Sequence, residues 1–309
     1  MVRKGNASDM KCNPRVTCIV LNWNGSAHTI ECLGALNACT YPHLTVIIVD
    51  NGSTDDSVSL ISRAFPDITL LKTDKNLGFA GGNNVGIGHA LAHGAEADYV
   101  WLLNNDTKPA PDALSALVSK ADTDRQIAAV ASICYYADSP NTVQVWGGAR
   151  VNLWFGYSRN ATEPHKDEWF DALYGASMLI RRAALEDVGL LDPGFFFYCE
   201  ETEFCLRLRK KGWRIAAAPD SIVLHKAGAS SGTSTLRDRY FTASGLRVLR
   251  LHSSIPSLAM ASFLTLRLTR RLLAFNFSRC RSVWAGMQDY WRASRSLSQA
   301  SDIRYGRRS

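Results

Sequence analysis

Short apolar runs alternate with helix-like segments over the first 121 residues, and this alternation limits the fold more than any other feature. The apolar runs cover residues 16–22, 44–50, 68–72 and 99–104. Helices are expected at about residues 29–37, 57–64, 79–93 and 111–121. The run 44–50 is almost wholly apolar, which is typical of a strand that is buried on both faces. This order predicts an α/β fold with a mostly parallel sheet flanked by helices.

A polar cluster follows each of these predicted strands. The clusters are Asn22-Trp23-Asn24-Gly25, Asp50-Asn51-Gly52-Ser53, Asn76-Leu77-Gly78 and Asn104-Asn105-Asp106. Any one of them could be a turn, because Asn and Asp readily adopt turn conformations. Ligands of open α/β sheets bind beyond the carboxyl ends of the strands. Four polar clusters at that edge therefore predict a shared ligand site.

The ligand of this site is not expected to be a dinucleotide. The first strand is not followed by G-x-G-x-x-G, and the sequence contains no G-x-x-x-x-G-K-[ST] motif. A nucleotide can instead be held by carboxylate and amide contacts to its base, with a divalent cation on its phosphates. Because Mg²⁺ often uses only one or two carboxylates together with phosphate oxygens, Asp106 is suited to this role.

The second half of the chain has weaker signals. Residues 143–171 are expected to be irregular, and their glycines and the side chain of Trp146 could form a wall of an acceptor cleft or simply pack on the surface. A short helix is expected at 183–187. Strands are expected at residues 173–181 and 214–219, and residues 221–225 then lead to a loop.

Two glutamates, Glu200 and Glu201, follow the aromatic run 195–198 at the start of a predicted helix. Acidic residues are favoured there by the helix dipole, which is one explanation. The other is a general base whose pKa is raised by the aromatic surroundings. His225, which lies at a loop after the predicted strand 214–219, is either a packing or surface residue or a ligand for Mg²⁺ or Mn²⁺.

The positive charge is concentrated near the C-terminus. The chain carries +7, whereas residues 236–309 alone contain 14 Arg, no Lys and 3 Asp, and so carry +11. Such a tail could bind nucleic acid or an anionic membrane surface. Residues 255–266 are apolar but too few to span a bilayer, and Arg267, Arg270 and Arg271 follow them. This segment is either a basic amphipathic helix on the inner leaflet, or a helix packed on the protein with its arginines in solvent.

The eight cysteines form no C-x-x-C pair, which favours small hydrophobic residues in a reducing compartment. Residues 1–14 contain no apolar segment of the kind found in signal peptides. We therefore expect a cytoplasmic protein, or one held peripherally on the inner face of the cell membrane.

Seven motifs together resemble the family 2 inverting glycosyltransferases of the GT-A fold, in particular rhamnosyltransferase-like members. In family order they are VLNWNG (20–25), VDNGSTDDS (49–57), NLGFAGGNNVGI (76–87), LLNNDT (102–107), GASMLIRR (175–182), FFFYCEETEFCLRLRKKGW (195–213) and VLHKAG (223–228). The resemblance implies a GT-A catalytic domain over residues 14–235 with a Rossmann-like sheet. A basic, largely helical C-terminal extension would follow over residues 236–309.

The resemblance also implies roles for individual residues. Asp50 would accept the N3–H of a uracil or thymine ring, and Asp106 and His225 would bind Mg²⁺ or Mn²⁺. The residues implied to line the nucleotide-sugar pocket are Asn22, Asn24, Asn51, Ser53, Asn76, Gly78, Asn83, Asn104 and Asn105. Glu201 falls on the usual base position, with Glu200 as the alternative because the family pair is normally Glu-Asp. The acceptor contacts would be Trp146, Gly175 and Ala176.

The implied reaction is a metal-assisted single displacement that inverts the sugar. A dTDP- or UDP-sugar, with dTDP-rhamnose first, would donate to a glycan or a polyprenyl-linked acceptor. A nucleotidyltransferase is the alternative enzyme, but residues 24–28 contain no Lys or Arg to hold a triphosphate. A membrane- or nucleic-acid-binding module acting through the arginine-rich tail is the non-enzymatic alternative, and it leaves the polar sheet edge unexplained. We expect no nucleic-acid partner.

Overall fold

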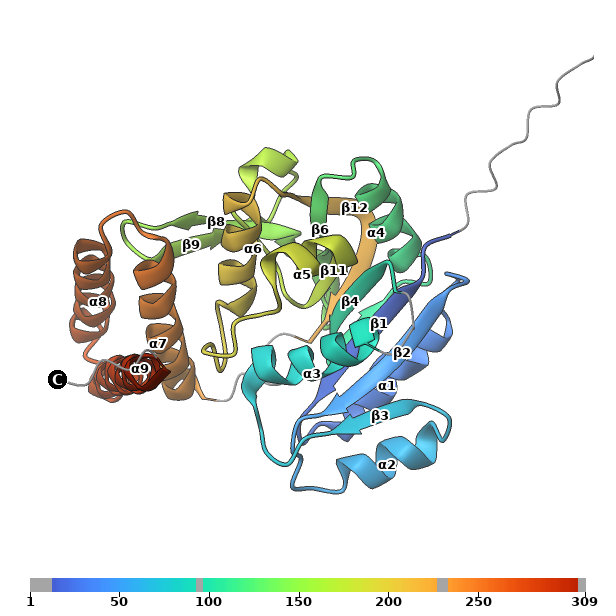
Figure 1. Ribbon diagram of the computed structural model, residues 1–309, viewed down its shortest axis with the longest axis horizontal. Coiled ribbons are helices and arrows are strands. Elements are labelled where there is room, and N and C mark those ends of the chain that lie inside the picture. Colours follow the sequence, from blue (N-terminus) through green and yellow to red (C-terminus); the bar gives the residue numbers. More distant parts are fainter. Residues whose placement is uncertain (1–12, 93–96, 227–232, 305–309) are drawn as a thin grey trace, which may run out of the picture.

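A nine-stranded sheet forms the centre of the computed structural model, which describes residues 13–92, 97–226 and 233–304 (Figure 1). The strands run in the order β3-β2-β1-β4-β11-β6-β12-β5, and β7 pairs with β6. Their bounds are β1 (Val16–Asn22), β2 (Leu44–Asp50), β3 (Thr69–Lys72), β4 (Tyr99–Asn104), β5 (Thr107–Pro109), β6 (Ile127–Tyr136), β7 (Ser139–Trp146), β11 (Ser177–Arg181) and β12 (Arg214–His225). The α/β fold predicted from the alternating pattern is confirmed.

The first four strands of the chain pair in parallel, as predicted, and this brings their polar ends together. Asn22 pairs with Asp50 across β1 and β2, while Leu21 pairs with Asn104 across β1 and β4. β11 runs antiparallel to both of its neighbours, and β12 runs parallel to β6. The sheet is therefore mixed, with its parallel half carrying the polar edge.

Helices cover both faces of this sheet. They are α1 (Ser26–Asn37), α2 (Ser57–Ala64), α3 (Gly78–Ala92), α4 (Ala113–Asp122), α5 (Arg182–Val188) and α6 (Glu200–Lys210). Side chains of α1, α2 and α4, such as Leu33, Ile61 and Leu114, belong to one buried apolar cluster with one face of the sheet. Side chains of α3 and α6, such as Ile87 and Phe204, belong to a second cluster on the other face. Two apolar cores therefore fix the sheet edge on which the predicted site lies.

The region predicted to be irregular, residues 143–171, contains strands. Part of β7 lies there, followed by β8 (Gly148–Asn152), β9 (Tyr157–Asn160) and a short 3-10 helix η1 (Asp167–Trp169). β8 pairs with β9 and with β10 (Ala172–Leu173) in a small three-stranded sheet. All four residues of β9 are exposed, so the strand has none of the apolar alternation from which strands are predicted.

Two further strand predictions need correction. The single strand expected at residues 173–181 is divided between β10 in the small sheet and β11 in the main sheet. The strand expected at 214–219 continues to His225 as β12, whose pairing with β6 is irregular between Ala218 and Ile222. Pro219 lies in that irregular stretch, where its lack of an N–H removes a ladder hydrogen bond.

Three helices follow the sheet: α7 (Ser234–His252), α8 (Pro256–Leu273) and α9 (Phe277–Arg304). They pack around a third apolar cluster that includes Leu246, Leu249 and Phe263. Figure 1 shows α7 between α8 and the rest of the protein, with α8 at the outer edge. Among the helices that the structure describes, none is long and apolar enough to cross a membrane.

Two of the three arginines of α8 do not lie where either interpretation of the tail placed them, whereas Arg270 is exposed. Both Arg267 and Arg271 point inward and form ion pairs with the buried Asp238 of α7, where Arg279 of α9 joins them. Neither solvent nor a lipid surface is therefore the partner of Arg267 and Arg271. The apolar pattern of residues 255–266 gave no sign of this, because the acidic partner lies on another helix.

Several predicted features lie outside the described residues. They are residues 1–12, which bear on the signal-peptide prediction, His93 at the end of a predicted helix, the last two residues of VLHKAG, and residues 305–309. The seven cysteines within the described residues are free thiols.

Candidate active site

Asp50, at the end of β2, is buried at the centre of the polar edge. Its Oδ1 atom accepts hydrogen bonds from Asn22 Nδ2 at 2.8 Å and Ser53 Oγ at 2.6 Å, and its Oδ2 atom accepts one from the Ser53 N–H. The Oδ1 atom of Asn22 in turn accepts from Thr29 Oγ1 at 2.8 Å. Both ends of the fully buried Asn22 amide are thus used within the protein, so Asn22 orients Asp50. The carboxylate of Asp50 retains lone pairs for a further donor.

Asn51 holds the loop that leads from β3 into α3. Its Nδ2 atom donates to Asn76 Oδ1 at 3.1 Å and to the Gly78 carbonyl at 3.0 Å, while its Oδ1 atom accepts from the Leu77 N–H at 3.0 Å. Gly78 has a φ of +74°, and a Cβ atom there would overlap the carbonyl oxygen of Phe196. Glycine is needed at this position both for its φ and for the close approach of the chain. Asn51 and Asn76 therefore shape the pocket loop.

Two other predicted pocket residues differ in their exposure. Asn24, at a φ of +49°, is exposed and pairs through its Oδ1 atom with the Thr54 N–H at 2.8 Å. Asn83 is buried, and its Nδ2 atom donates to the Phe79 carbonyl at 2.9 Å within α3. Asn24 is accessible to a ligand, whereas Asn83 is engaged in the packing of its own helix.

Asn104 and Asn105 end β4 at the same edge. The backbone N–H of Asn104 donates to the Ala176 carbonyl at 2.9 Å, and its side chain is partly exposed. Asn105 is buried, and its Nδ2 atom donates to Thr29 Oγ1 at 3.0 Å. Thr29 therefore links the ends of β1 and β4, and Asn104 is the more accessible of the two amides.

Asp106 and His225 meet although they come from distant segments. β5 pairs antiparallel with β12 so that Thr107 lies opposite His225, and the Lys226 N–H donates to the Asp106 carbonyl at 3.0 Å. His225 Nε2 then lies 3.2 Å from Asp106 Oδ1, with both side chains almost fully buried. Strand register thus brings together the two residues that the resemblance implied as metal ligands.

The surroundings of His225 fit a cation. Its Nδ1 atom lies 2.7 Å from Gln144 Oε1, and an amide oxygen can only accept, so Nδ1 carries the proton and Nε2 presents a lone pair. The Oδ1 atom of Asp106 accepts no hydrogen bond from any described residue. Two electron-rich buried atoms facing each other suit a divalent cation between them. Over the described residues no third His, Cys, Asp or Glu joins them, which leaves positions for phosphate and water.

Glu200 and Glu201 open α6, as predicted. Burial raises the pKa of Glu201 to about 7, partly offset by hydrogen bonds from the backbone N–H groups of Glu201 and Thr202. Burial, together with the charge of Glu201, raises the pKa of Glu200 well above its ordinary value. Glu200 is nearly inaccessible to solvent and its Oε2 atom has no partner among the described residues. Glu201 is the more exposed carboxylate and has a pKa suited to accepting a proton near neutral pH.

The turn before these glutamates is strained. Tyr198 has a φ of +71° and Cys199 a φ of +65°, so two consecutive non-glycine residues are left-handed. Each costs about 1–2 kcal/mol in isolation. Contacts from α7 hold the segment, because Ser244 Oγ donates to the Phe197 carbonyl at 2.9 Å and Tyr198 packs on Phe241. This backbone geometry sets the direction in which α6 presents its first turn.

A short segment between β10 and β11 joins the two parts of the site. The Tyr174 hydroxyl lies 3.4 Å from His225 Nδ1, and Gly175 lies against the Glu201 side chain. A Cβ atom at Gly175 would be 3.5 Å from Cβ and Cγ of Glu201. Ala176 is buried and bonds Asn104 through its carbonyl. Of the predicted acceptor residues, Gly175 lies beside the glutamate, whereas Trp146 packs on the main core.

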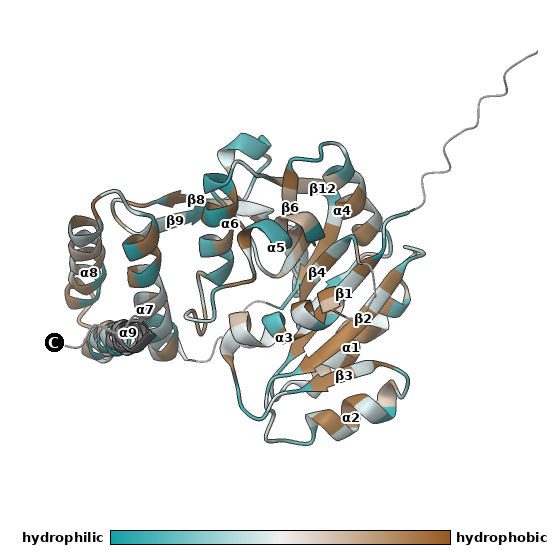
Figure 2. Cartoon of the chain, in the orientation of Figure 1, coloured by the Kyte–Doolittle hydropathy of each residue, from teal (hydrophilic) through white to brown (hydrophobic). Residues whose placement is uncertain are grey.

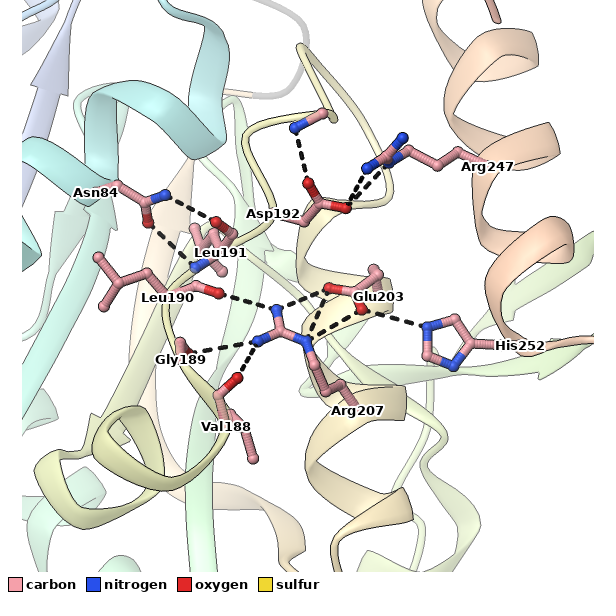
Figure 3. Close-up of polar contacts among 11 residues, drawn as sticks. Asn84, Val188, Gly189, Leu190, Leu191, Asp192, Glu203, Arg207, Arg247 and His252 are labelled. Carbon is pink, nitrogen blue, oxygen red and sulfur yellow. Dashed lines mark hydrogen bonds and ion pairs between the residues drawn. The ribbon is translucent and has the colours of Figure 1, made fainter. Parts of the chain in front are cut away.

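Arg207 anchors α6 behind the site (Figure 3). It forms an ion pair with the buried Glu203 and donates to the carbonyls of Val188 and Leu190 at 2.6 and 2.9 Å. His252 of α7 contacts the same glutamate at 3.3 Å. These contacts attach α6 to α7 and to the loop that follows α5.

The loop after α5 is held from two sides (Figure 3). The side chain of Asn84 bonds both the N–H and the carbonyl of Leu191, and Arg247 of α7 pairs with Asp192. Arg207, Asn84 and Arg247, like Gln144 and Tyr174 around His225, were not identified from the sequence. Their roles depend on contacts between distant elements, for which the sequence carries no local signal.

The comparisons with known proteins agree on one class. A family model described as "Glycosyltransferase like family 2" matches residues 14–245. The N-acetylglucosaminyl-diphospho-decaprenol L-rhamnosyltransferase of Mycobacterium tuberculosis is 27% identical over 235 residues, which cover 69% of this chain and 76% of that protein. The rhamnosyltransferase WbbL of Escherichia coli K12 is 25% identical over 206 residues, covering 58% and 77%. A Pyrobaculum calidifontis mannosyltransferase, solved with GDP-mannose and Mn²⁺, superposes with a TM-score of 0.58 at 20% identity, covering 95% and 81%.

Proposed function

The chain belongs to the glycosyltransferase family 2-like proteins, and from this we propose that it transfers L-rhamnose from a pyrimidine nucleotide sugar to a glycan or polyprenyl-linked acceptor. That it is a glycosyltransferase with the GT-A fold follows from the family and from the superposition. The choice of sugar is supported by two relatives that are named rhamnosyltransferases, one of which is named for a decaprenol-linked substrate. A cytoplasmic location stays a prediction.

The observation that carries this proposal is the set of contacts that residues 174–176 make with both parts of the site. Gly175 lies against Glu201, Tyr174 contacts His225, and Ala176 bonds the end of β4 next to Asp106. One three-residue segment thus connects Glu201, whose pKa is raised to about 7, to the buried pair Asp106 and His225, to which we assign the metal. A sugar donor held at Asp106 and His225 and an acceptor held at Glu201 would be on neighbouring sides of this segment.

Each side chain then has a definite task. Asp50 accepts the N3–H of the pyrimidine, and Asn22 and Ser53 keep its carboxylate oriented. Asp106 Oδ1 and His225 Nε2 would hold Mg²⁺ or Mn²⁺. When bound, this ion supplies Lewis-acid stabilisation of the charge that builds on the leaving diphosphate. The Mn²⁺ in the mannosyltransferase structure supports the use of a divalent cation.

Glu201 takes the proton of the acceptor hydroxyl while the hydroxyl oxygen attacks the anomeric carbon from the face opposite the nucleotide. The bond between the anomeric carbon and the diphosphate oxygen breaks, and the nucleoside diphosphate leaves with both bonding electrons. The sugar configuration inverts, and no covalent sugar–protein intermediate forms. Glu200 is buried, and its pKa is raised well above its ordinary value by burial and by the charge of Glu201, so we assign the base to the more accessible Glu201.

A donor screen tests the proposed function. The full chain is incubated with dTDP-, UDP-, GDP- and ADP-sugars in the presence of Mg²⁺ or Mn²⁺, and thermal shift and nucleotide release are measured. We expect dTDP-rhamnose to give the largest shift and the fastest release. A larger shift with GDP- or ADP-sugars would overturn the pyrimidine assignment of Asp50, and a dTDP- or UDP-sugar other than rhamnose would overturn only the choice of sugar.

A further inference from the structure

The outer face of α8 is apolar although its inner face carries arginines. Leu258, Leu266, Leu272 and Leu273 are all about half exposed or more, and at 100° per residue they fall within one third of the helix circumference. Arg267, Arg271 and Phe263 point the other way, toward α7. A helix on the surface of a soluble protein normally shows the reverse arrangement. Figure 2 shows α8 at the edge of the molecule with mostly apolar colouring.

The turn from α8 to α9 extends this apolar face. Leu273 is 75%, Phe275 80% and Phe277 62% exposed. Phe275 is also left-handed, with a φ of +50°, which is uncommon for a bulky residue. Three large apolar side chains therefore lie in solvent within five residues.

An aromatic row on α9 begins at the same turn. Phe277, Trp284 and Trp291 are spaced seven residues apart, so they lie on one side of the helix, and both tryptophans are about half exposed. Tryptophan is enriched where a protein meets the boundary between lipid headgroups and acyl chains. The α8–α9 turn thus joins an apolar helix face to an interfacial aromatic row.

The charge around these side chains is positive. Arg270 of α8 and Arg281 and Arg292 of α9 are exposed. α8 contains no acidic residue, and the two acidic residues nearest in the C-terminal helices, Asp238 and Asp289, already pair with arginines. Exposed leucine, phenylalanine and tryptophan with a rim of arginine are complementary to a membrane that contains anionic lipid.

We propose that α8 and α9 dock on an anionic lipid surface through this turn, with Leu272, Leu273, Phe275, Phe277, Trp284 and Trp291 entering the interface. Arg270, Arg281 and Arg292 then face the lipid phosphates. The surface differs from the one predicted from sequence, since Arg267 and Arg271 are held inside by Asp238. Docking of this kind does not depend on which sugar is transferred or on how the donor binds.

Vesicle co-sedimentation of the full chain tests the docking surface. Vesicles of phosphatidylcholine alone are compared with vesicles that also contain phosphatidylglycerol, at low salt. We expect binding to the anionic vesicles, and a fall of about a hundredfold or more when Leu273→Ser, Phe275→Asn and Phe277→Ser are combined. These three residues are exposed, and Asn tolerates the left-handed position, so an unchanged thermal melt is expected.

A charge-matched pair of variants tests the arginine rim. Arg270→Gln with Arg281→Gln should weaken binding to anionic vesicles by about fivefold for each arginine. Arg63→Gln with Arg125→Gln removes the same charge from exposed positions on the catalytic part, and should have little effect. Equal loss in both pairs would show that net charge alone drives binding and would overturn the assigned surface.

Two other outcomes would also overturn it. One is no binding to either kind of vesicle. The other is a concentration-dependent dimer, seen by light scattering, that is abolished by the triple variant in the absence of vesicle binding, since the apolar turn would then be the contact with a second copy of the chain.

Discussion

The Nε2 atom of His225 faces the Oδ1 atom of Asp106 at 3.2 Å, and no hydrogen bond joins the two atoms. On the opposite side of the ring, the Nδ1–H of His225 donates a hydrogen bond to Gln144 Oε1. This arrangement supports the proposed cation site, and its geometry is set by strand pairing between β5 and β12.

Replacing Asp106 by alanine should abolish turnover while the fold survives, because the side chain contributes no hydrogen bond to the protein through Oδ1. Calorimetry with Mn²⁺ and dTDP provides a measurement that does not depend on activity, and binding of the ion should be lost. Asp112→Ala, which removes an exposed carboxylate at the start of α4, is the control. Full activity of the unaltered protein in excess chelator would contradict the metal assignment.

Glu201→Gln should lower kcat by about 10²- to 10⁴-fold, which is the usual contribution of a general base. The amide keeps the size of the side chain but cannot take a proton, so donor affinity should change little. Glu200→Gln should have a much smaller effect, because Glu200 is buried and already favours its neutral form. If Glu200→Gln is the inactive variant and Glu201→Gln is not, the roles of the two glutamates are reversed.

The pH dependence of activity should report the same residue. Since the pKa of Glu201 is about 7, the base is protonated below that pH and kcat/KM should fall with a slope of one as the pH decreases. The profile of Glu201→Gln should lack this limb. An unaltered limb in that variant would assign the titration to another group.

Glu201 should also make the protein less stable at high pH. Its folded pKa is raised above the unfolded value, so the folded state binds more protons and stability is lost as the pH rises from about 4.5 through about 7. Glu201→Gln should therefore raise the free energy of unfolding by on the order of 1–3 kcal/mol at pH 8, and by little at pH 4. Chemical denaturation at the two pH values measures this, and equal effects at both would refute it.

Replacing each of two glycines in α3 by alanine should have opposite effects on the stability of the protein. Gly78→Ala should destabilise by about 1–3 kcal/mol and reduce activity, because φ is +74° and the Phe196 carbonyl occupies the space of the new Cβ. Gly88→Ala has open space around it and an ordinary helical φ, so it should stabilise by up to about 1 kcal/mol. Thermal melts and donor KM values of both variants distinguish a local effect at the pocket loop from a general effect on the helix.

Asp238→Asn should cost about 3–5 kcal/mol, since it leaves three partly buried arginines without their common counter-charge. Asp289→Asn is the matched control, with a more exposed carboxylate that pairs closely with Arg239, and should cost clearly less. The pKa of Asp238 is lowered to about 2 by these arginines, so its contribution should persist above pH 4 and be lost only as the pH falls toward 2. Similar losses of unfolding free energy in both variants would show that the cluster around Asp238 contributes no more than an ordinary ion pair.

Much of the polar edge could be predicted from the sequence because each polar cluster directly follows an apolar strand. β1, β2 and β4 have this pattern, and parallel pairing places Asn22, Asp50 and Asn104 side by side. What the pattern could not distinguish is a side chain that faces the ligand from one that supports it. Asn22 and Asn51 look like pocket residues, yet their amides are used in hydrogen bonds to the protein itself.

The residues that were missed act across large distances in the chain. Gln144 approaches His225 through the pairing of β7 and β12 with β6, and Tyr174 lies just before β11, which also pairs with β6. β9 is too exposed and β10 too short to show a periodic pattern. The inward arginines of α8 were misread for a similar reason. Their charge can be counted in the sequence, but their pairing with Asp238 on another helix cannot be predicted from it.

The contacts of α7 have a consequence for how the chain unfolds. Ser244 and Tyr240 hold the strained turn before Glu200, while Arg247 and His252 bind the loop and the helix on either side of it. A chain cut near residue 235 would lose every one of these restraints at once, and the left-handed pair Tyr198-Cys199 would relax. The catalytic part and the C-terminal helices should therefore denature in a single cooperative transition, and limited proteolysis between them should release an inactive fragment rather than a working minimal enzyme.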